Sequence, residues 1–139
     1  MPILELYSVR DGIVPPQSGL NWCFADAHVN TEDAYIALTA SFLREQPNFF
    51  PSHGNVINVV WDDGKEMKCL LEGTQSINGK IYPKQISSYN DKSEIGHYLR
   101  KRLGVDAMHV ITMKDLNNYG RNYIDVTHLG NNRYSFDFS

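Results

Sequence analysis

Two groups of side chains in this sequence could belong to a catalytic or metal site. Asp62, Asp63 and Glu66 stand close enough together to suggest a carboxylate cluster of the kind a metal-dependent nuclease uses. They flank an Asp-Gly turn, however, where Asp is favoured for backbone reasons. The five histidines are scattered and follow no metal-site spacing. The turn interpretation is favoured, and a metal-dependent nuclease stays open as an alternative.

Sequence motifs of catalysis are missing from the chain. It contains no GxSxG, HExxH, phosphate-cradling GxxxxGK[ST] or dinucleotide-binding GxGxxG. Cys23 and Cys69 lie in apolar surroundings without a CxxC pair, so we interpret them as reduced core thiols. We therefore predict no catalytic residue, no metal ion and no cofactor.

Polar side chains instead gather in two segments and on one predicted helix. Asn and Gln can bond adenine, Arg and Lys guanine, and Asp and Glu the amino group of cytosine, while Ser and Lys suit phosphates. This set predicts a double-stranded DNA partner. The residues expected to contact DNA are Asn21, Trp22, Asp26, His28, Asn30, Thr31, Asp33, Gln75, Ser76, Asn78, Lys80, Tyr82, Lys84, Gln85, Asn90, Lys92, Ser93, His97, Arg100 and Lys101.

The distribution of charge supports that partner. Lys80 to Gly104 contains six cations and two anions, so it carries +4 in a chain whose net charge is −3. A local excess of this kind is typical of a face that attracts a polyanion, although a solvated basic helix would look the same. Lys92, Arg100 and Lys101 are the expected phosphate contacts. The pI near 5.9 argues against indiscriminate nucleic-acid binding.

Length and composition predict one folded domain over residues 1–139, with a hydrophobic content of 42%. No apolar run is long enough to span a bilayer, and the N-terminus lacks the features of a signal peptide. We expect a soluble, intracellular protein without a membrane partner.

Hydrophobic alternation and turn residues predict a strand-rich frame beneath the polar segments. The strands expected to bracket the first polar segment are 20–24 and 34–38, and Asn78-Gly79 predicts a second long hairpin. Further strands are expected at 3–7, 56–61, 66–71, 123–127 and 134–138, with helices at 40–46, 92–103 and 112–119. The fold class is therefore α+β, mostly β, an open barrel of seven or eight short strands with two or three short helices.

Longer stretches of sequence carry a resemblance to a known family. They are SGLNW at 18–22, EDAYIAL at 32–38, FFP at 49–51, WDDG at 61–64, NGK at 78–80, SEIGHYLRKRLG at 93–104, ITMKDLNNYGR at 111–121 and YSFDFS at 134–139. In this order they resemble the C-terminal DNA-recognition domain of NgoFVII-type restriction endonucleases, whose catalytic half is phospholipase-D-like.

The resemblance implies a seven-stranded open pseudobarrel like that of plant B3 transcription factors. It implies an N-arm, residues 21–33, and a C-arm, residues 75–90, that enter the major groove at one short site. The chain has no phospholipase-D HxK signature, so a separate nuclease domain or subunit would cut the DNA. It further implies a role in bacterial restriction-modification and defence, in the cytoplasm.

One alternative of another class also stays open. A small barrel could bind carbohydrate or peptide on a stacking platform of Trp22, Tyr35 and Tyr82. Such a site would show little dependence on salt, whereas binding to DNA would be strongly salt-dependent.

Overall fold

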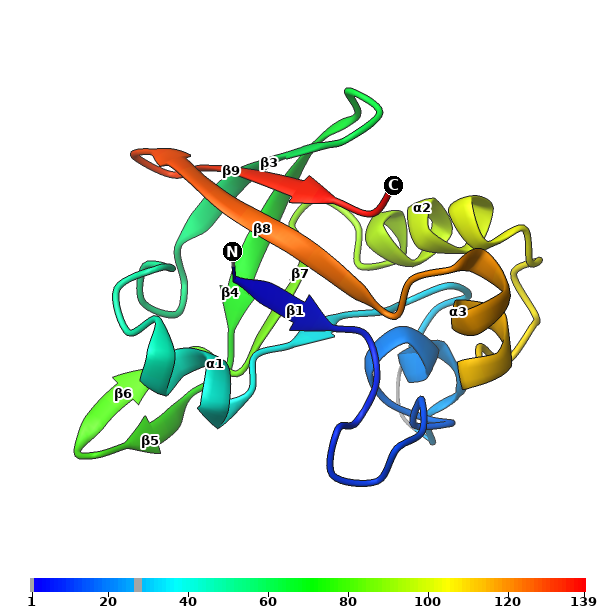
Figure 1. The fold of residues 1–139 in the computed structure, drawn as a ribbon, viewed down its shortest axis with the longest axis horizontal. Coiled ribbons are helices and arrows are strands. Elements are labelled where there is room, and N and C mark those ends of the chain that lie inside the picture. The colour runs from blue at the N-terminus through cyan, green and yellow to red at the C-terminus, as the bar shows by residue number, and fades with distance from the viewer. Residues whose placement is uncertain (1, 27–28) are drawn as a thin grey trace.

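The computed structural model describes residues 2–26 and 29–139, and its main feature is a curved sheet of seven strands (Figure 1). Their order is β1-β8-β9-β3-β4-β7-β2, with β3 and β9 parallel and the other neighbours antiparallel. The bounds are β1 Ile3–Glu5, β2 Ile36–Ala37, β3 Val56–Trp61, β4 Glu66–Glu72, β7 Gln85–Ser88, β8 Tyr123–Gly130 and β9 Arg133–Asp137. The edge strands β1 and β2 lie beside each other where the sheet stays open. The predicted seven-stranded open pseudobarrel is confirmed.

The strands β3 and β4 show why these sequences form a half-buried sheet. Ile57, Val59 and Trp61 of β3 point into the core, while Asn58 between them is exposed. The pattern repeats in β4, where every second side chain is buried. This alternation follows from the two-residue period of a strand. The Asp-Gly turn predicted between the two strands is confirmed.

The described residues form three α-helices outside the sheet: α1 Ala40–Glu45, α2 Ser93–Leu103 and α3 Met113–Tyr119. Thr39 caps α1 as predicted, because its Oγ1 accepts a hydrogen bond of 3.1 Å from the amide of Phe42. Gly104 ends α2 with φ at +73°, which a glycine adopts without strain. No helix among the described residues has the length and apolar character needed to cross a membrane.

The strand predicted at 20–24 is wrong, because the chain forms the 3-10 helix η1, Gly19–Phe24. Gly19 has φ at +58°, which turns the chain before a ladder can start. The buried amide of Asn21 then bonds the carbonyls of Pro15 and Ile111 at 2.9 and 2.8 Å. These side-chain bonds stabilise the turn conformation in place of a strand.

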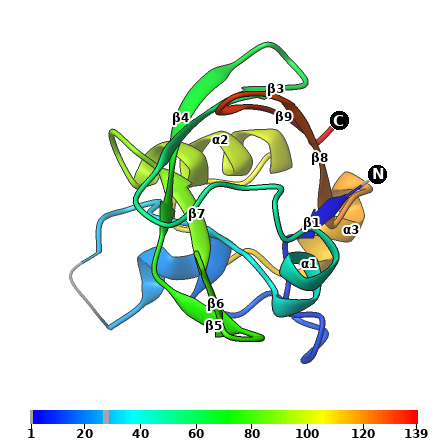
Figure 2. The same cartoon turned by 90° about the vertical axis from the view of Figure 1, so that its left-hand side faces the viewer.

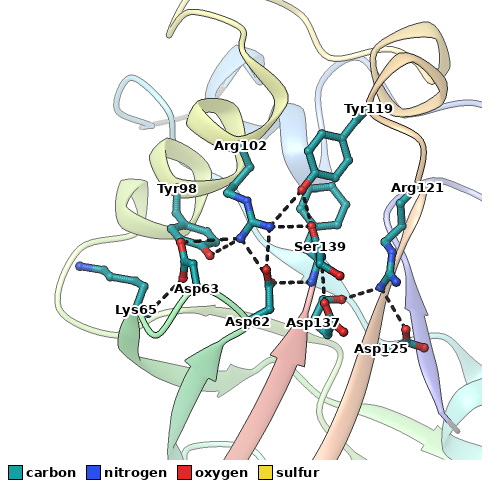
Figure 3. Close-up of polar contacts among 11 residues, drawn as sticks. Asp62, Asp63, Lys65, Tyr98, Arg102, Tyr119, Arg121, Asp125, Asp137 and Ser139 are labelled. Carbon is teal, nitrogen blue, oxygen red and sulfur yellow. Dashed lines mark hydrogen bonds and ion pairs between the residues drawn. The ribbon is translucent and has the colours of Figure 1, made fainter.

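A polar cluster around Arg102 joins α2 to the far end of the sheet (Figure 3). The guanidinium bonds both oxygens of Asp62, at 3.3 and 2.8 Å, and the carbonyl of Phe138 at 2.8 Å. It also donates to the hydroxyls of Tyr98 and Tyr119, at 2.6 and 3.0 Å. Partial burial would raise the pKa of Asp62, but the bonds from Arg102 and from the Phe138 amide lower it overall.

This cluster generates the first prediction. Arg102→Met should lower the free energy of unfolding by about 2 kcal/mol, because Asp62 and the Phe138 carbonyl lose a charged donor. Since the pKa of Asp62 is lowered by folding, its stabilisation is present above its ordinary value of 3.8 and is lost as the pH falls through the folded-state value. Urea titrations at pH 7 and pH 3 would measure both effects.

The matched control is Lys101→Met, which replaces the exposed neighbouring cation on the same helix. It should leave the urea midpoint almost unchanged. Equal losses for the two variants, or a loss in Arg102→Met that does not shrink at pH 3, would contradict the stabilising role of the ion pair.

Candidate functional site

The two arms predicted from the sequence leave the sheet from neighbouring strands. β2, which follows the N-arm, pairs with β7, which lies within the C-arm, through Ile36 with Ile86 and Ala37 with Gln85. Because the pair is antiparallel, the N-arm joins it at the Ile36–Ile86 end and the β5–β6 hairpin at the Ala37–Gln85 end. Both arms lie on the side of the molecule away from the β3–β4 turn, with the β5–β6 hairpin at the lower left of Figure 1 and the N-arm at its lower right (Figures 1 and 2). The arms therefore flank the edge strand β2.

The C-arm carries the predicted second hairpin, formed by β5 Gln75–Ile77 and β6 Lys80–Tyr82. Asn78 and Gly79 both have positive φ, 51° and 79°, as an Asn-Gly hairpin turn requires. The exposed predicted contacts here are Ser76, Asn78, Lys80 and Lys84. The arm contains these two lysines and no acidic residue, so it carries +2. Its tip can meet a polyanion without repulsion.

The predicted contacts at the base of the C-arm have structural roles. The Gln75 amide nitrogen donates to the carbonyls of Leu38 and Pro83, both at 3.0 Å. Tyr82 is half-buried against the core, with the Lys80 ammonium 5.0 Å from its ring centre. Gln85 is half-buried in β7. The amide nitrogen of Gln75 is thus used inside the protein, and contact of this side chain with a base stays a prediction.

Two predicted contacts of the N-arm are buried. Asn21 is 0% exposed, and its Oδ1 accepts from the Ile111 amide at 2.8 Å in addition to its bonds as a donor. Asp33 is 3% exposed, and its Oδ2 accepts from the Asn30 amide at 2.8 Å. Neither side chain can reach a base in this conformation. The prediction that they contact DNA is corrected for this structure.

Only some of the remaining predicted DNA contacts of the N-arm are exposed. Asp26, Asn30 and Thr31 are exposed, whereas Trp22 is half-buried and packs edge-on against Tyr35 at 5.7 Å. His28 lies outside the described residues. Over residues 21–33 the chain has three acids and no Lys or Arg. The N-arm therefore offers hydrogen-bond acceptors and little attraction for phosphate.

Lys92 is not a free cation. Its ammonium pairs with Glu72 and lies 2.9 Å from the Ser87 hydroxyl, which also bonds Glu72. Partial burial tends to raise the pKa of Glu72, but the bonds and charge of this network lower it overall. Local sequence patterns do not reveal Glu72 and Ser87 as partners of Lys92, because they lie on β4 and β7 and are 20 and 5 positions away. The prediction that Lys92 seats a phosphate is therefore weakened.

The predicted basic face of α2 is mostly used inside the protein. Arg100 is 1% exposed and Arg102 is paired with Asp62, so neither lies on a solvent face. The expectation of an exposed Arg100 is wrong. Lys101 remains exposed on α2, and it has no ion-pair partner among the described residues. Of the other predicted contacts, Asn90 and His97 are exposed, and Ser93 bonds Asp91 at the start of the helix.

Neither alternative site is assembled by the fold. Asp62 is paired with Arg102, and Asp63 accepts from the Lys65 amide at 3.0 Å, as a turn residue does. In residues 2–26 and 29–139 no group of three His, Cys, Asp or Glu could hold a metal ion. Trp22 and Tyr35 pack at the base of the N-arm, and within the same ranges neither ring contacts that of Tyr82. The three rings form no common platform.

Comparison with known proteins gave one family. Its model, the NgoFVII C-terminal B3-like DNA-binding domain, matches residues 4–129 of the 139 in the chain. A search of curated proteins gave no match.

The role of Gln75 gives a prediction about the C-arm. Gln75→Ala should loosen the β5–β6 hairpin, because two carbonyls lose their donor. Hydrogen exchange of the hairpin amides should rise by about tenfold while the amides of β3 and β4 stay protected. Ser76→Ala, at the neighbouring exposed position, should leave the exchange rates unchanged. Unaltered hairpin exchange in Gln75→Ala would exclude the anchoring role.

Proposed function

The chain belongs to the NgoFVII C-terminal B3-like DNA-binding domain family, and from this premise we propose that it reads one short duplex sequence with its two arms in the major groove. DNA binding is the property of the family; the sequence preference, the groove and the role of the arms are the proposal. The arrangement of the arms on either side of β2 is the observation that carries it.

The charges of the arms suggest different tasks. Lys80 and Lys84 of the C-arm, with Lys101 on α2, can contact phosphates and set the register of the protein on the duplex. Asp26 of the N-arm can accept a hydrogen bond from the amino group of cytosine, and Asn30 can bond adenine. This division favours selective binding over binding to any polyanion.

The proposal extends to the biological setting. We place the chain as the recognition part of a restriction endonuclease in the bacterial cytoplasm, where it would take part in defence. Cleavage would be supplied by a separate nuclease domain or subunit. The bonds of Asp62 to Arg102 and of Asp63 to the Lys65 amide support this division, because these carboxylates serve the ion pair and the turn.

Selection from a random duplex pool tests the proposal directly. The purified chain at about 0.15 M salt should retain one motif of a few base pairs. A pool without enrichment would contradict sequence-specific reading. Addition of Mg²⁺ should give no cleavage of the enriched duplex by this chain, and specific cleavage would instead support the nuclease alternative.

The phosphate contacts can be tested by charge removal. The double variant Lys80→Ala, Lys84→Ala should weaken binding to all duplexes alike and reduce the slope of log K against log salt by about 2. The control is Arg133→Ala, which removes an exposed cation beside the β8–β9 turn at the far end of the molecule (Figures 1 and 2). An unchanged slope in the double variant, or an equal change in the control, would exclude the C-arm lysines as phosphate contacts.

A further inference from the structure

Helix α2 contacts the N-arm at both ends of the arm. At the end that leads into β2, the amide of Ala34 donates to the carbonyl of Lys92 at 3.3 Å, and the carboxylate of Glu32 lies 3.1 Å from His97 Nδ1. At the other end, Arg100 binds residues of η1. Positions 92, 96 and 100 recur every four residues, so they share one side of the helix. The arm therefore lies along one face of α2, with η1 beside the helix (Figure 2).

The backbone of the arm approaches the helix closely at Gly96. A Cβ atom at this position would stand 1.8 Å from the carbonyl oxygen of Glu32 and 3.1 Å from the Cβ of Ala34. Glu32 itself has φ at +68°, a conformation that residues other than glycine rarely adopt. The backbone of the arm is thus held in an uncommon conformation against a position that only glycine can occupy.

The buried Arg100 side chain forms hydrogen bonds with the beginning of the arm. Its guanidinium donates to the carbonyls of Leu20 and His109, at 3.2 and 3.1 Å, and lies 3.5 Å from Asn21 Oδ1. It also lies 3.8 Å from the sulfur of Cys23 and 5.9 Å from the ring centre of Phe24. Within the described residues no carboxylate pairs with it. A buried cation held by carbonyls fixes the direction in which η1 leaves the barrel, because a fork of donors needs acceptors in fixed positions.

We propose that α2 is the mount of the N-arm, and that Gly96 and Arg100 are positioning residues that determine sequence specificity without touching DNA. The inference deepens the proposed function, since it assumes that the N-arm reads bases. Displacement of the mount misplaces the acceptors of the N-arm and removes discrimination between bases. Attraction to phosphate persists, because Lys80, Lys84 and Lys101 remain in place.

The test compares Gly96→Ala and Arg100→Lys with Lys101→Gln. Alanine is the better helix former, so a loss in Gly96→Ala cannot come from helix propensity. Both mount variants should bind the duplex enriched by selection about tenfold more weakly, and a scrambled duplex within about twofold of the wild type. Lys101→Gln should give the opposite pattern, with equal losses on both duplexes and a salt slope reduced by about 1. Retained discrimination in both mount variants would overturn the inference.

Hydrogen exchange without DNA tests the mount itself. The amides of Cys23 and Asp33 bond the carbonyls of Asp33 and Asn30, at 2.9 and 3.1 Å, within the N-arm. In Gly96→Ala they should exchange about tenfold faster, while the Trp61 amide, bonded to Lys65 at 2.8 Å, should be unchanged. Unchanged N-arm exchange would overturn the mount. Uniformly faster exchange or global unfolding would do so as well, because Gly96 would then support the barrel rather than the arm.

The two readouts separate this inference from the proposed function. If the N-arm amides loosen in Gly96→Ala but the wild-type chain prefers no duplex, the proposed function fails and the mount stands. If the wild type is selective and Gly96→Ala stays equally selective, the proposed function stands and the mount does not control it.

Discussion

The rest of the molecule depends on two arginines of α2 that point away from the solvent in different directions. Arg102 binds Asp62 and the Phe138 carbonyl, at the end of the sheet where the chain terminates. Arg100, about 200° around the helix, binds the carbonyls of Leu20 and His109. A guanidinium taken out of water needs acceptors, and the terminal nitrogens of both side chains find several, so each side chain fixes the elements that supply them. One helix therefore supports the barrel on one side and the N-arm on the other.

The inward arginines also change the electrostatics expected from the sequence. The excess of +4 over Lys80 to Gly104 includes Arg100 and Arg102, which are used inside the protein, and Lys92, which is paired with Glu72. Of the six cations in that stretch, only Lys80, Lys84 and Lys101 remain exposed without an ion pair among the described residues. In a chain with net charge −3, so few cations give weak attraction to phosphate alone. Under the proposed function, the remaining affinity would come from contacts that depend on sequence, such as those of the acidic N-arm.

Sequence alone predicted the turns, caps and helix ends that depend on residues close together in the chain. The Asn78-Gly79 turn, the Thr39 cap and the helix end at Gly104 each depend on residues within a few positions, and each is confirmed. Local patterns could not predict the burial of Arg100, because the carbonyl it binds belongs to Leu20, 80 positions away. The Asn21 amide likewise meets the carbonyl of Ile111, 90 positions away.

The error at Arg100 has a simple physical cause. It adjoins Leu99 in the buried stripe of α2, and a cation beside such a stripe looks solvent-exposed until its acceptors are known. Loops that return from distant parts of the chain supply those acceptors. Counting charges along a sequence overestimates the exposed charge most at long polar side chains that border a buried face.

The exposed side chains of the arms and the contacts that hold the arm backbone belong to different residues. This difference limits which residues can change if the recognised DNA sequence changes. Asn30, Thr31 and Ser76 are exposed, so replacement of these side chains costs little stability. The Asn78-Gly79 turn and the contacts with α2 fix the backbone beneath them. If the tips read bases as proposed, their side chains can vary with the sequence recognised while the barrel stays the same. The supports have no such freedom, because a Cβ at Gly96 would collide with the backbone of the arm.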